Sequence, residues 1–191
     1  MRGLDLWSLK SKTYRAGRSL PLVRRILDTE VRNLKALLCD IEVPLDGILD
    51  IGSGSGSTLD ILPKGKFRIF MDRSTGMTRT LRQMHAYVVR ADAQSMPFRE
   101  GSFSFVAAVG LTEYIREKDR LVDEVERVIL PGGFFLSTIS PPGLLNSLRN
   151  LMGHRIHSIR RGVWKRLLSS RGFRIQSECK SMVQAQFLYK S

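Results

Sequence analysis

The sequence predicts an α/β fold in three layers, with a mostly parallel sheet between helices. An apolar strand over residues 47–51 leads directly into a glycine-rich turn, further short apolar runs follow it, and an amphipathic helical pattern precedes it. Strands of a parallel sheet are buried on both faces, so apolar runs separated by helices are typical of this class. At 191 residues, the chain can bury a substantial core as one domain.

The glycine turn, Gly52-Ser53-Gly54-Ser55-Gly56, is the most informative segment for function. Glycine leaves room for a ligand beside the backbone and tolerates positive φ, and we expect a helix to follow, with exposed N–H groups available to polar ligand atoms. A dinucleotide fingerprint would need its third glycine at position 57, and a P-loop would need a lysine after Gly56. The chain has Ser57 there, which argues against NAD and against ATP or GTP.

Two later strands are each followed by an acid. Residues 67–71 read as a second strand that ends on Asp72, 20 residues beyond Gly52. A carboxylate at this place can accept hydrogen bonds from the hydroxyls of an adenosine ribose. A third strand near residue 88 leads to Asp92, and a fourth spans residues 102–109. The order of these motifs predicts a cofactor site built from successive strand ends.

Residues 50–56 follow the pattern Asp-x-Gly-x-Gly-x-Gly. Together with residues 67–72, 88–109 and 124–136, they resemble the Rossmann-like (class I) S-adenosylmethionine-dependent methyltransferases, closest to the broad small-molecule and quinone methyltransferase group. The resemblance covers residues 45–140 and implies a seven-stranded, mostly parallel sheet with an antiparallel last strand. It also implies S-adenosylmethionine as cofactor and S-adenosylhomocysteine as product. The residues that it assigns to the cofactor are Asp50, Gly52, Ser53, Gly54, Gly56, Asp72, Arg73, Asp92, Ala93, Val109 and Gly110.

Two features concern the rest of this core. The family usually has Asp at the start of its fourth strand, where this chain has Ser104, so the hydrogen bonding at that strand start is expected to differ. The segment Pro131-Gly132-Gly133 is similar to the family's turn between a helix and the fifth strand. We expect it to end the helix and reverse the chain.

Residues 110–115 follow the fourth strand, at the edge where open α/β sheets bind ligands. Glu113 and Tyr114 are therefore the candidate catalytic residues on the acceptor side. An acid favoured at a helix start and a packed aromatic ring would explain the same two residues. Methyl transfer from a sulfonium depends mainly on alignment, and a general base helps only where the acceptor must lose a proton.

The net charge of +13 lies outside the core. Residues 141–191 carry 10 Lys and Arg against one acid, and residues 1–40 carry nine against four, whereas residues 41–140 are nearly neutral. Clustered cations attract polyanions, which favours an anionic acceptor, an anionic membrane surface or RNA. The same cations could simply solvate the surface. No recognised RNA-binding motif is present, and nothing indicates an obligate protein partner.

We interpret the chain as a single methyltransferase domain of three parts: a basic helical cap (1–40), the cofactor-binding core (45–140) and a basic substrate-side segment ending in a hairpin (141–191). Apolar residues recur at helical spacing across residues 21–38, and Tyr14 is a candidate lid aromatic in the preceding arm. An antiparallel hairpin over residues 173–189 is expected from the family.

Composition limits the other possibilities. Cys39 and Cys179 are too few for a disulfide framework, and His154 and His157 have no third ligand nearby, so no metal site is predicted. No apolar run reaches the length of a membrane span, and the N-terminus lacks a signal-peptide core. We therefore expect a cytoplasmic location, with peripheral contact to a membrane surface as an option.

Three functional hypotheses follow. The leading one is an S-adenosylmethionine-dependent methyltransferase acting on a small-molecule or lipid-like acceptor, which can be anionic. The second is an RNA methyltransferase that uses the basic flanks as a phosphate-contacting surface. The third is a non-catalytic, cofactor-binding interaction protein.

Overall fold

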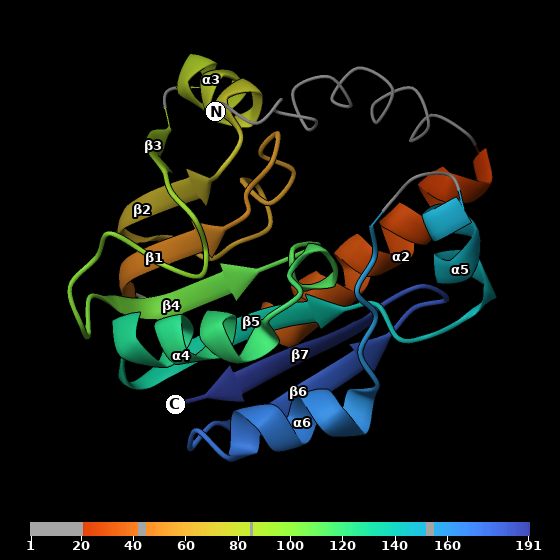
Figure 1. Cartoon of the computed structure of the whole chain (residues 1–191). Helices are drawn as coiled ribbons and strands as arrows, with labels where there is room; N and C mark the ends of the chain where they lie inside the picture. The colour runs from red at the N-terminus through yellow and green to blue at the C-terminus, as the bar shows by residue number, and fades with distance from the viewer. Residues whose placement is uncertain (1–20, 42–44, 85, 152–154) are drawn as a thin grey trace.

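The computed structural model describes residues 21–41, 45–84, 86–151 and 155–191 (Figure 1). Two sequence candidates, Tyr14 and His154, lie outside the described residues, as does the first half of the predicted cap. The helices are α2 (Pro21–Leu38), α3 (Thr75–Gln83), the 3-10 turn η1 (Thr112–Tyr114), α4 (Lys118–Val128), α5 (Leu144–Leu151) and α6 (Arg161–Ser169). The strands are β1 (Leu45–Ile51), β2 (Gly65–Asp72), β3 (Tyr87–Arg90), β4 (Phe103–Ala108), β5 (Ile129–Ile139), β6 (Arg174–Lys180) and β7 (Ala185–Lys190).

The strands form one seven-stranded sheet in the order β3-β2-β1-β4-β5-β7-β6. β1 to β5 run parallel, and β7 is antiparallel to both of its neighbours, β5 and β6. The predicted mostly parallel sheet with an antiparallel last strand is therefore confirmed. Because β6 and β5 both oppose β7, the carboxyl end of β6 lies at the same sheet edge as those of β1 to β5.

Within the described part of the chain, no helix is long and apolar enough to cross a membrane.

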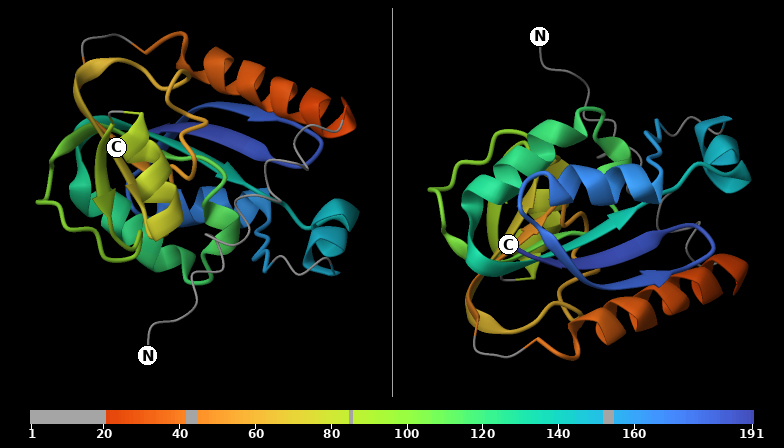
Figure 2. Two further views of the ribbon diagram at one scale, coloured as in Figure 1. Left: turned by 90° about the horizontal axis from the view of Figure 1, so that it is seen from above. Right: turned by 90° about the horizontal axis from the view of Figure 1, so that it is seen from below.

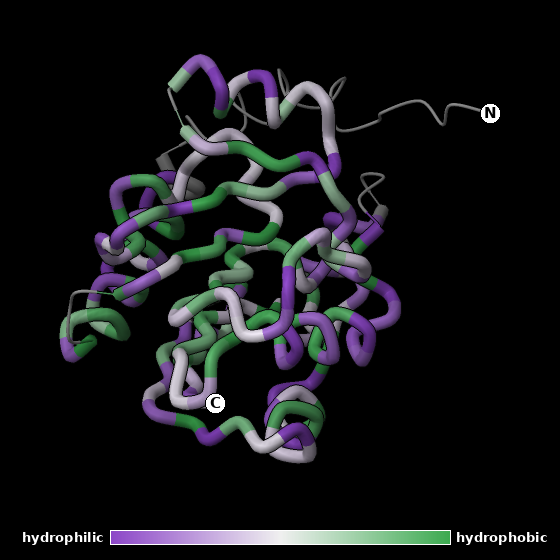
Figure 3. Tube along the Cα trace, turned by 90° about the vertical axis from the view of Figure 1, so that its left-hand side faces the viewer, coloured by the Kyte–Doolittle hydropathy of each residue, from purple (hydrophilic) through white to green (hydrophobic). Residues whose placement is uncertain are grey.

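Helices cover both faces of the sheet. α2 lies along one face, and α4 and α6 lie on the opposite face (Figure 2). On the α2 side, Leu34 and Leu37 pack into a cluster with Ile48, Phe105 and Leu136 of the sheet. Full burial of each leucine stabilises the fold by about 1.5–3 kcal/mol. Figure 3 shows the hydrophobic stretches concentrated in the central strands, as expected for strands buried on both faces.

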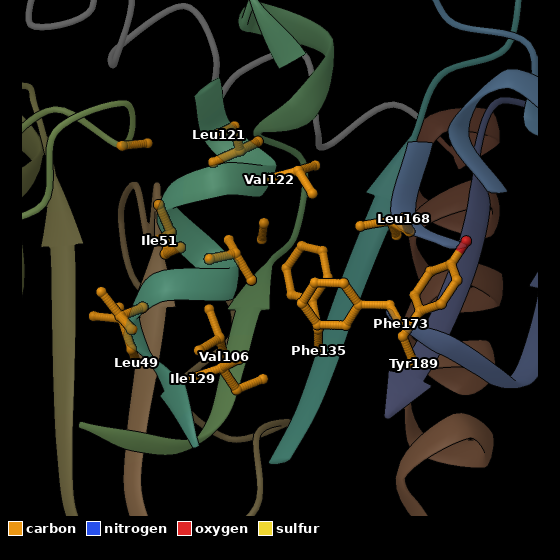
Figure 4. Packing of buried hydrophobic residues seen from close by; sticks show 14 of the residues in the cluster. Leu49, Ile51, Val106, Leu121, Val122, Ile129, Phe135, Leu168, Phe173 and Tyr189 are labelled. Carbon is orange, nitrogen blue, oxygen red and sulfur yellow. The ribbon is translucent and has the colours of Figure 1, made fainter. Parts of the chain in front are cut away.

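The second core lies between the sheet and helices α4 and α6. Leu121 and Val122 of α4 share one buried cluster with residues of β1, β4 and β5, and Leu168 of α6 packs near Phe135 and Tyr189 of the sheet (Figure 4). All five side chains are essentially inaccessible to solvent. This packing fixes β1 and β4 relative to each other, so the segments that leave their carboxyl ends start from rigid supports.

The helix predicted after the glycine turn is absent. Residues 54–61 instead form consecutive turns, in which the Leu62 N–H donates to the Thr58 carbonyl at 3.0 Å. Serine and glycine are poor helix formers, and Pro63 disfavours helical backbone in the residue before it. β2 begins at Gly65, so the connection has no room to extend the turn beyond that proline.

The Pro-Gly-Gly segment also differs from the prediction. α4 ends at Val128 and β5 begins at Ile129, so residues 131–133 lie within the strand rather than at the helix end. Phe103 pairs with Ile129, but the next pair joins Phe105 to Phe134. Gly132 has φ +76°, a conformation that glycine tolerates well. The segment is therefore a bulge that re-aligns β5 with β4.

Ser104 supplies the hydrogen bonds at the start of β4. Its hydroxyl donates to the Gly47 carbonyl at 3.1 Å and accepts from the Gly47 N–H at 3.3 Å. Ser104 therefore ties β4 to β1 through both backbone groups of a single residue.

Candidate functional site

The glycine turn lies at the carboxyl end of β1 and folds back on the end of β2. The N–H groups of Gly52 and Ser53 donate to the Met71 carbonyl at 2.7 and 3.1 Å, and the Gly56 N–H donates to Ser53 at 2.9 Å. The expectation that these groups are exposed to a ligand was therefore wrong. The backbone donors of Gly52, Ser53, Gly54 and Gly56 are instead bonded to the end of β2 and to the turn itself.

The three glycines are required for different reasons. All have positive φ, at +70°, +55° and +88° for Gly52, Gly54 and Gly56. A Cβ at Gly52 would come within 2.7 Å of Leu111, and one at Gly56 within 2.6 Å of Leu59. A Cβ at Gly54 would meet no protein atom nearer than 3.9 Å. Gly54 thus borders open space, whereas the other two are closely packed.

The Asp50 carboxylate is buried at the end of β1. Its Oδ2 accepts from the Thr58 hydroxyl at 2.5 Å, while Oδ1 is buried without a hydrogen-bond partner in the described chain. Burial raises the pKa of Asp50 to about 7, against the lowering effect of hydrogen bonds from Thr58 and Ser53. An unpartnered buried acceptor costs about 1–3 kcal/mol. A ligand donor placed at Oδ1 would remove this cost.

Asp72 ends β2, as the sequence predicted, and it faces the glycine turn. Its Oδ2 accepts from the Gly54 N–H at 2.9 Å and its Oδ1 from the Ser74 N–H at 2.8 Å. Ser74 in turn caps α3, since its side chain accepts from the Met77 N–H. One carboxylate therefore fixes both the glycine turn and the entry into the next helix.

Asp92 lies just beyond the end of β3. Its Oδ1 accepts from the Gln94 N–H at 3.0 Å, and its Oδ2 lies 3.4 Å from the Arg73 guanidinium. The Arg73 side chain is mostly exposed, so this ion pair contributes little to stability. Ala93 is buried beside it. The structure thus brings Asp50, Asp72 and Asp92 to one sheet edge, at the ends of three adjacent strands.

Two residues that the sequence did not single out hold the segment after Asp92. Glu124 of α4 accepts from the Met96 N–H at 2.5 Å, and Arg127 donates to the carbonyls of Met96 and Phe98 at 3.0 and 2.7 Å. Arg127 also pairs with Glu124 at 2.7 Å. In the sequence this pair looks like an ordinary solvated i, i+3 pair, so no local signal distinguishes it.

Val109 and Gly110 follow β4 toward the acceptor side. The Gly110 N–H donates to the Thr138 hydroxyl at 2.7 Å, and the Thr112 hydroxyl donates to the Thr138 carbonyl. A Cβ at Gly110 would meet no protein atom within 4 Å. β5 therefore anchors the segment after β4 while leaving open space beside Gly110.

Glu113 is buried in a polar network rather than directed at open space. Its Oε1 accepts from Arg149 of α5 at 2.7 Å, and its Oε2 accepts from the Ser140 hydroxyl. Arg149 also donates to the Tyr114 hydroxyl at 3.2 Å and to the Asn146 amide oxygen at 3.1 Å. These residues come from η1, the end of β5 and α5, so Glu113 ties α5 to the sheet edge.

Lys118 connects the same region to residues 155–160. Its ammonium donates to the Ile115 carbonyl at 2.8 Å and to the His157 carbonyl at 2.7 Å. The His157 N–H donates to the Glu113 carbonyl at 2.7 Å. Burial lowers the pKa of Lys118 to about 8, against the raising effect of the Glu113 charge. The acceptor-side segments are thus joined by polar bonds between elements distant in sequence.

Comparison with known proteins agrees with this geometry. Residues 49–137 match the model of a methyltransferase domain family. The chain is 29% identical over 124 residues to a malonyl-[acyl-carrier protein] O-methyltransferase of Geobacter sulfurreducens. The match covers 60% of this chain and 46% of that enzyme. The chain spans less than half the length of the curated relatives it matches.

Two solved structures share the fold over most of the chain. One is a Haloferax volcanii methyltransferase in complex with the Trm112 activator (TM-score 0.76, 15% identity, 98% of this chain and 97% of that chain). The other is magnesium protoporphyrin IX methyltransferase from Synechocystis with bound SAH (TM-score 0.72, 16% identity, 87% of this chain and 84% of that chain).

Proposed function

We propose that this chain, which belongs to the class I, Rossmann-like S-adenosylmethionine-dependent methyltransferases, transfers a methyl group to an anionic small-molecule or lipid-like acceptor. One observation carries the cofactor part of the proposal: Asp50, Asp72 and Asp92 lie at the carboxyl ends of three adjacent strands, around a glycine turn. This edge is where open α/β sheets bind ligands.

The residues present fit S-adenosylmethionine on three points. The unpartnered Oδ1 of Asp50 is suited to accept a hydrogen bond from the cofactor's ammonium group. Asp72 is suited to the ribose hydroxyls and Asp92, with the backbone of Ala93, to the adenine amino group. The space beside Gly54 and Gly110 is open to a ligand. The remaining predicted contacts are Gly52, Ser53, Gly56, Arg73 and Val109.

When bound, S-adenosylmethionine supplies a methyl group on a positively charged sulfur, so the protein's main task is to align the acceptor with it. Both oxygens of Glu113 already accept hydrogen bonds from protein groups. This arrangement suits a residue that positions the acceptor-side elements, and it suits a general base less well. Tyr114, whose hydroxyl is held by Arg149, is the proposed acceptor contact. An acceptor oxygen that is already ionised needs no general base.

Charge and similarity support an anionic acceptor. Four of the ten cations of residues 141–191 line a pocket at the carboxyl edge of β5 and β6, the edge at which we expect the acceptor to approach: Arg160, Arg161, Lys165 and Lys180. The Geobacter relative is named as an O-methyltransferase, which supports an oxygen as the methylated atom. RNA is the alternative acceptor, favoured by the same positive charge.

The first test is calorimetric titration of the purified chain with S-adenosylmethionine and S-adenosylhomocysteine, with NAD as the control. We expect saturable binding of the two sulfur compounds and none of NAD. Binding is measured before turnover because a protein partner, as in the Haloferax complex, could be needed for activity. Absence of binding by both sulfur compounds would contradict the proposal. Binding without transfer to any anionic small molecule, lipid or RNA would favour the non-catalytic alternative.

A further inference from the structure

An open pocket at the carboxyl edge of the sheet lies outside the predicted cofactor site. It has a volume of about 710 Å³ and lies between the residues after β5, the start of α6 and the end of β6. Its lining consists of Pro141, Pro142, Arg160, Arg161, Gly162, Lys165, Glu178 and Lys180. This volume falls within the roughly 300–1,000 Å³ of small-molecule sites.

The pocket is strongly cationic. Four basic side chains line it against a single carboxylate, so its formal charge is +3. Lys165 pairs with Glu178 at 2.5 Å, and the pKa of Glu178 is lowered by this hydrogen bond and by the nearby charges of Lys180 and Arg161. The side-chain charges of Arg160, Arg161 and Lys180 have no hydrogen-bond or ion-pair partner in the described chain. One carboxylate therefore cannot neutralise the cations that surround it.

The pocket adjoins the acceptor-side network. Pro141 follows Ser140, whose hydroxyl donates to the Glu113 carboxylate. Arg160 follows Ile159, whose N–H donates to the Ser140 carbonyl at 3.3 Å. Two lining residues, Pro141 and Arg160, are thus each next in sequence to a residue bonded in the Glu113 network, so the pocket lies beside that network.

We infer that this pocket binds a phosphate monoester carried by the methyl acceptor, with Arg160, Arg161 and Lys180 contacting the phosphate oxygens. A phosphate monoester carries a charge of about −1.5 to −2 at pH 7. This charge matches a +3 pocket better than the single negative charge of a carboxylate ligand would. Arginine presents paired N–H donors that suit phosphate oxygens. The cations also gather in one depression between β5, α6 and β6, which suits a single phosphate group, whereas RNA needs a track of cations along its backbone. The inference rests on the proposed function and names its acceptor class.

The test compares two double variants of the full chain. Arg161→Gln with Lys180→Gln removes two cations from the pocket. Arg79→Gln with Arg174→Gln removes the same charge from exposed positions of α3 and β6 that do not line it. Glycerol 3-phosphate binding is measured by calorimetry at constant ionic strength, with S-adenosylhomocysteine titrated in parallel. We expect saturable binding that weakens at least tenfold in the pocket variant and less than threefold in the control.

Several outcomes would overturn the inference. Equal weakening in both variants would mean that diffuse charge attracts the phosphate, and no saturable binding would remove the site. Tighter, steeply salt-dependent binding of a 20-nucleotide RNA, weakened equally by both variants, would favour RNA as acceptor. Vesicles containing phosphatidic acid identify the source: binding that depends on Arg161 and Lys180 places the phosphate on a lipid. If S-adenosylhomocysteine also fails to bind, the proposed function itself is contradicted, whereas its binding isolates the failure to this pocket.

Discussion

Asp72 provides the most direct test of the cofactor site. Its carboxylate accepts the N–H groups of Gly54 and Ser74 at 2.9 and 2.8 Å, and it is the proposed acceptor for the ribose hydroxyls. Asp72→Ala removes all of these acceptors at once. The substitution therefore leaves the ligand hydroxyls without a partner and also releases the glycine turn from β2.

The size of the effect follows from these bonds. Loss of a partner for a hydrogen-bonded hydroxyl costs about 1–3 kcal/mol, and each 1.4 kcal/mol is tenfold in Kd. We expect the affinity for S-adenosylhomocysteine to fall about 5- to 150-fold. Release of Gly54 and Ser74 also removes two charge-assisted hydrogen bonds, so we expect a lower melting temperature as well.

Calorimetry at a temperature where both proteins are folded separates the two effects. Glu126→Ala, which removes an exposed acid of α4, serves as the control and should leave the affinity within twofold of the parent. Circular dichroism before each titration checks that both proteins are folded. An unchanged affinity in a folded Asp72→Ala protein would refute the placement of the ribose at the end of β2.

Three further predictions address other parts of the site. Asp50 holds its proton more tightly in the folded state, with a pKa of about 7 against 3.8, so stability should fall as pH rises between these values. Asp50→Asn should flatten this slope in thermal unfolding, and a persisting slope would assign it elsewhere. Glu113→Gln leaves a partly exposed Arg149 without its charge partner, so we expect about 1–3 kcal/mol of destabilisation by denaturant unfolding and reduced turnover. Its S-adenosylhomocysteine affinity should stay within threefold, and loss of binding would move Glu113 to the donor site. Arg127→Ala releases the segment after Asp92, so the affinity for S-adenosylhomocysteine should fall about fivefold by calorimetry. Arg120→Ala, which removes an exposed cation of the same helix that pairs with Glu117, should leave this affinity unchanged.

The strand ends that form the proposed cofactor site could be predicted from the sequence. Each of its motifs is local: an apolar strand, an acid at its end and a turn or bend that follows within a few residues. The structure accordingly places Asp50 at the end of β1, Asp72 at the end of β2 and Asp92 just after β3. A parallel sheet then brings the three acids together without further information.

The details that the sequence did not predict depend on competing local preferences of the backbone or on contacts between residues far apart in the chain. The helix after the glycine turn is absent because serine and glycine are poor helix formers and Pro63 disfavours helical backbone just before β2, although the same pattern often precedes a helix. The partner of Glu113 is Arg149, 36 residues along the chain, and no periodicity or motif links the two. The anchoring role of Arg127 depends on carbonyls of the loop at residues 96–98, which the sequence alone cannot place.

The two halves of the proposed site are therefore held together differently. On the cofactor side, the turn after β1 is bonded to the backbone and terminal acid of β2, within a sheet buried on both faces. On the acceptor side, α5 and residues 155–160 are joined to the sheet edge largely through the side chains of Glu113, Lys118 and Arg149. Substituting a side chain removes its bonds without altering the backbone pairing of the sheet, so acceptor-side variants should change the acceptor preference while leaving the cofactor affinity nearly constant. A set of such variants in which cofactor affinity and acceptor selectivity always change together would contradict this division.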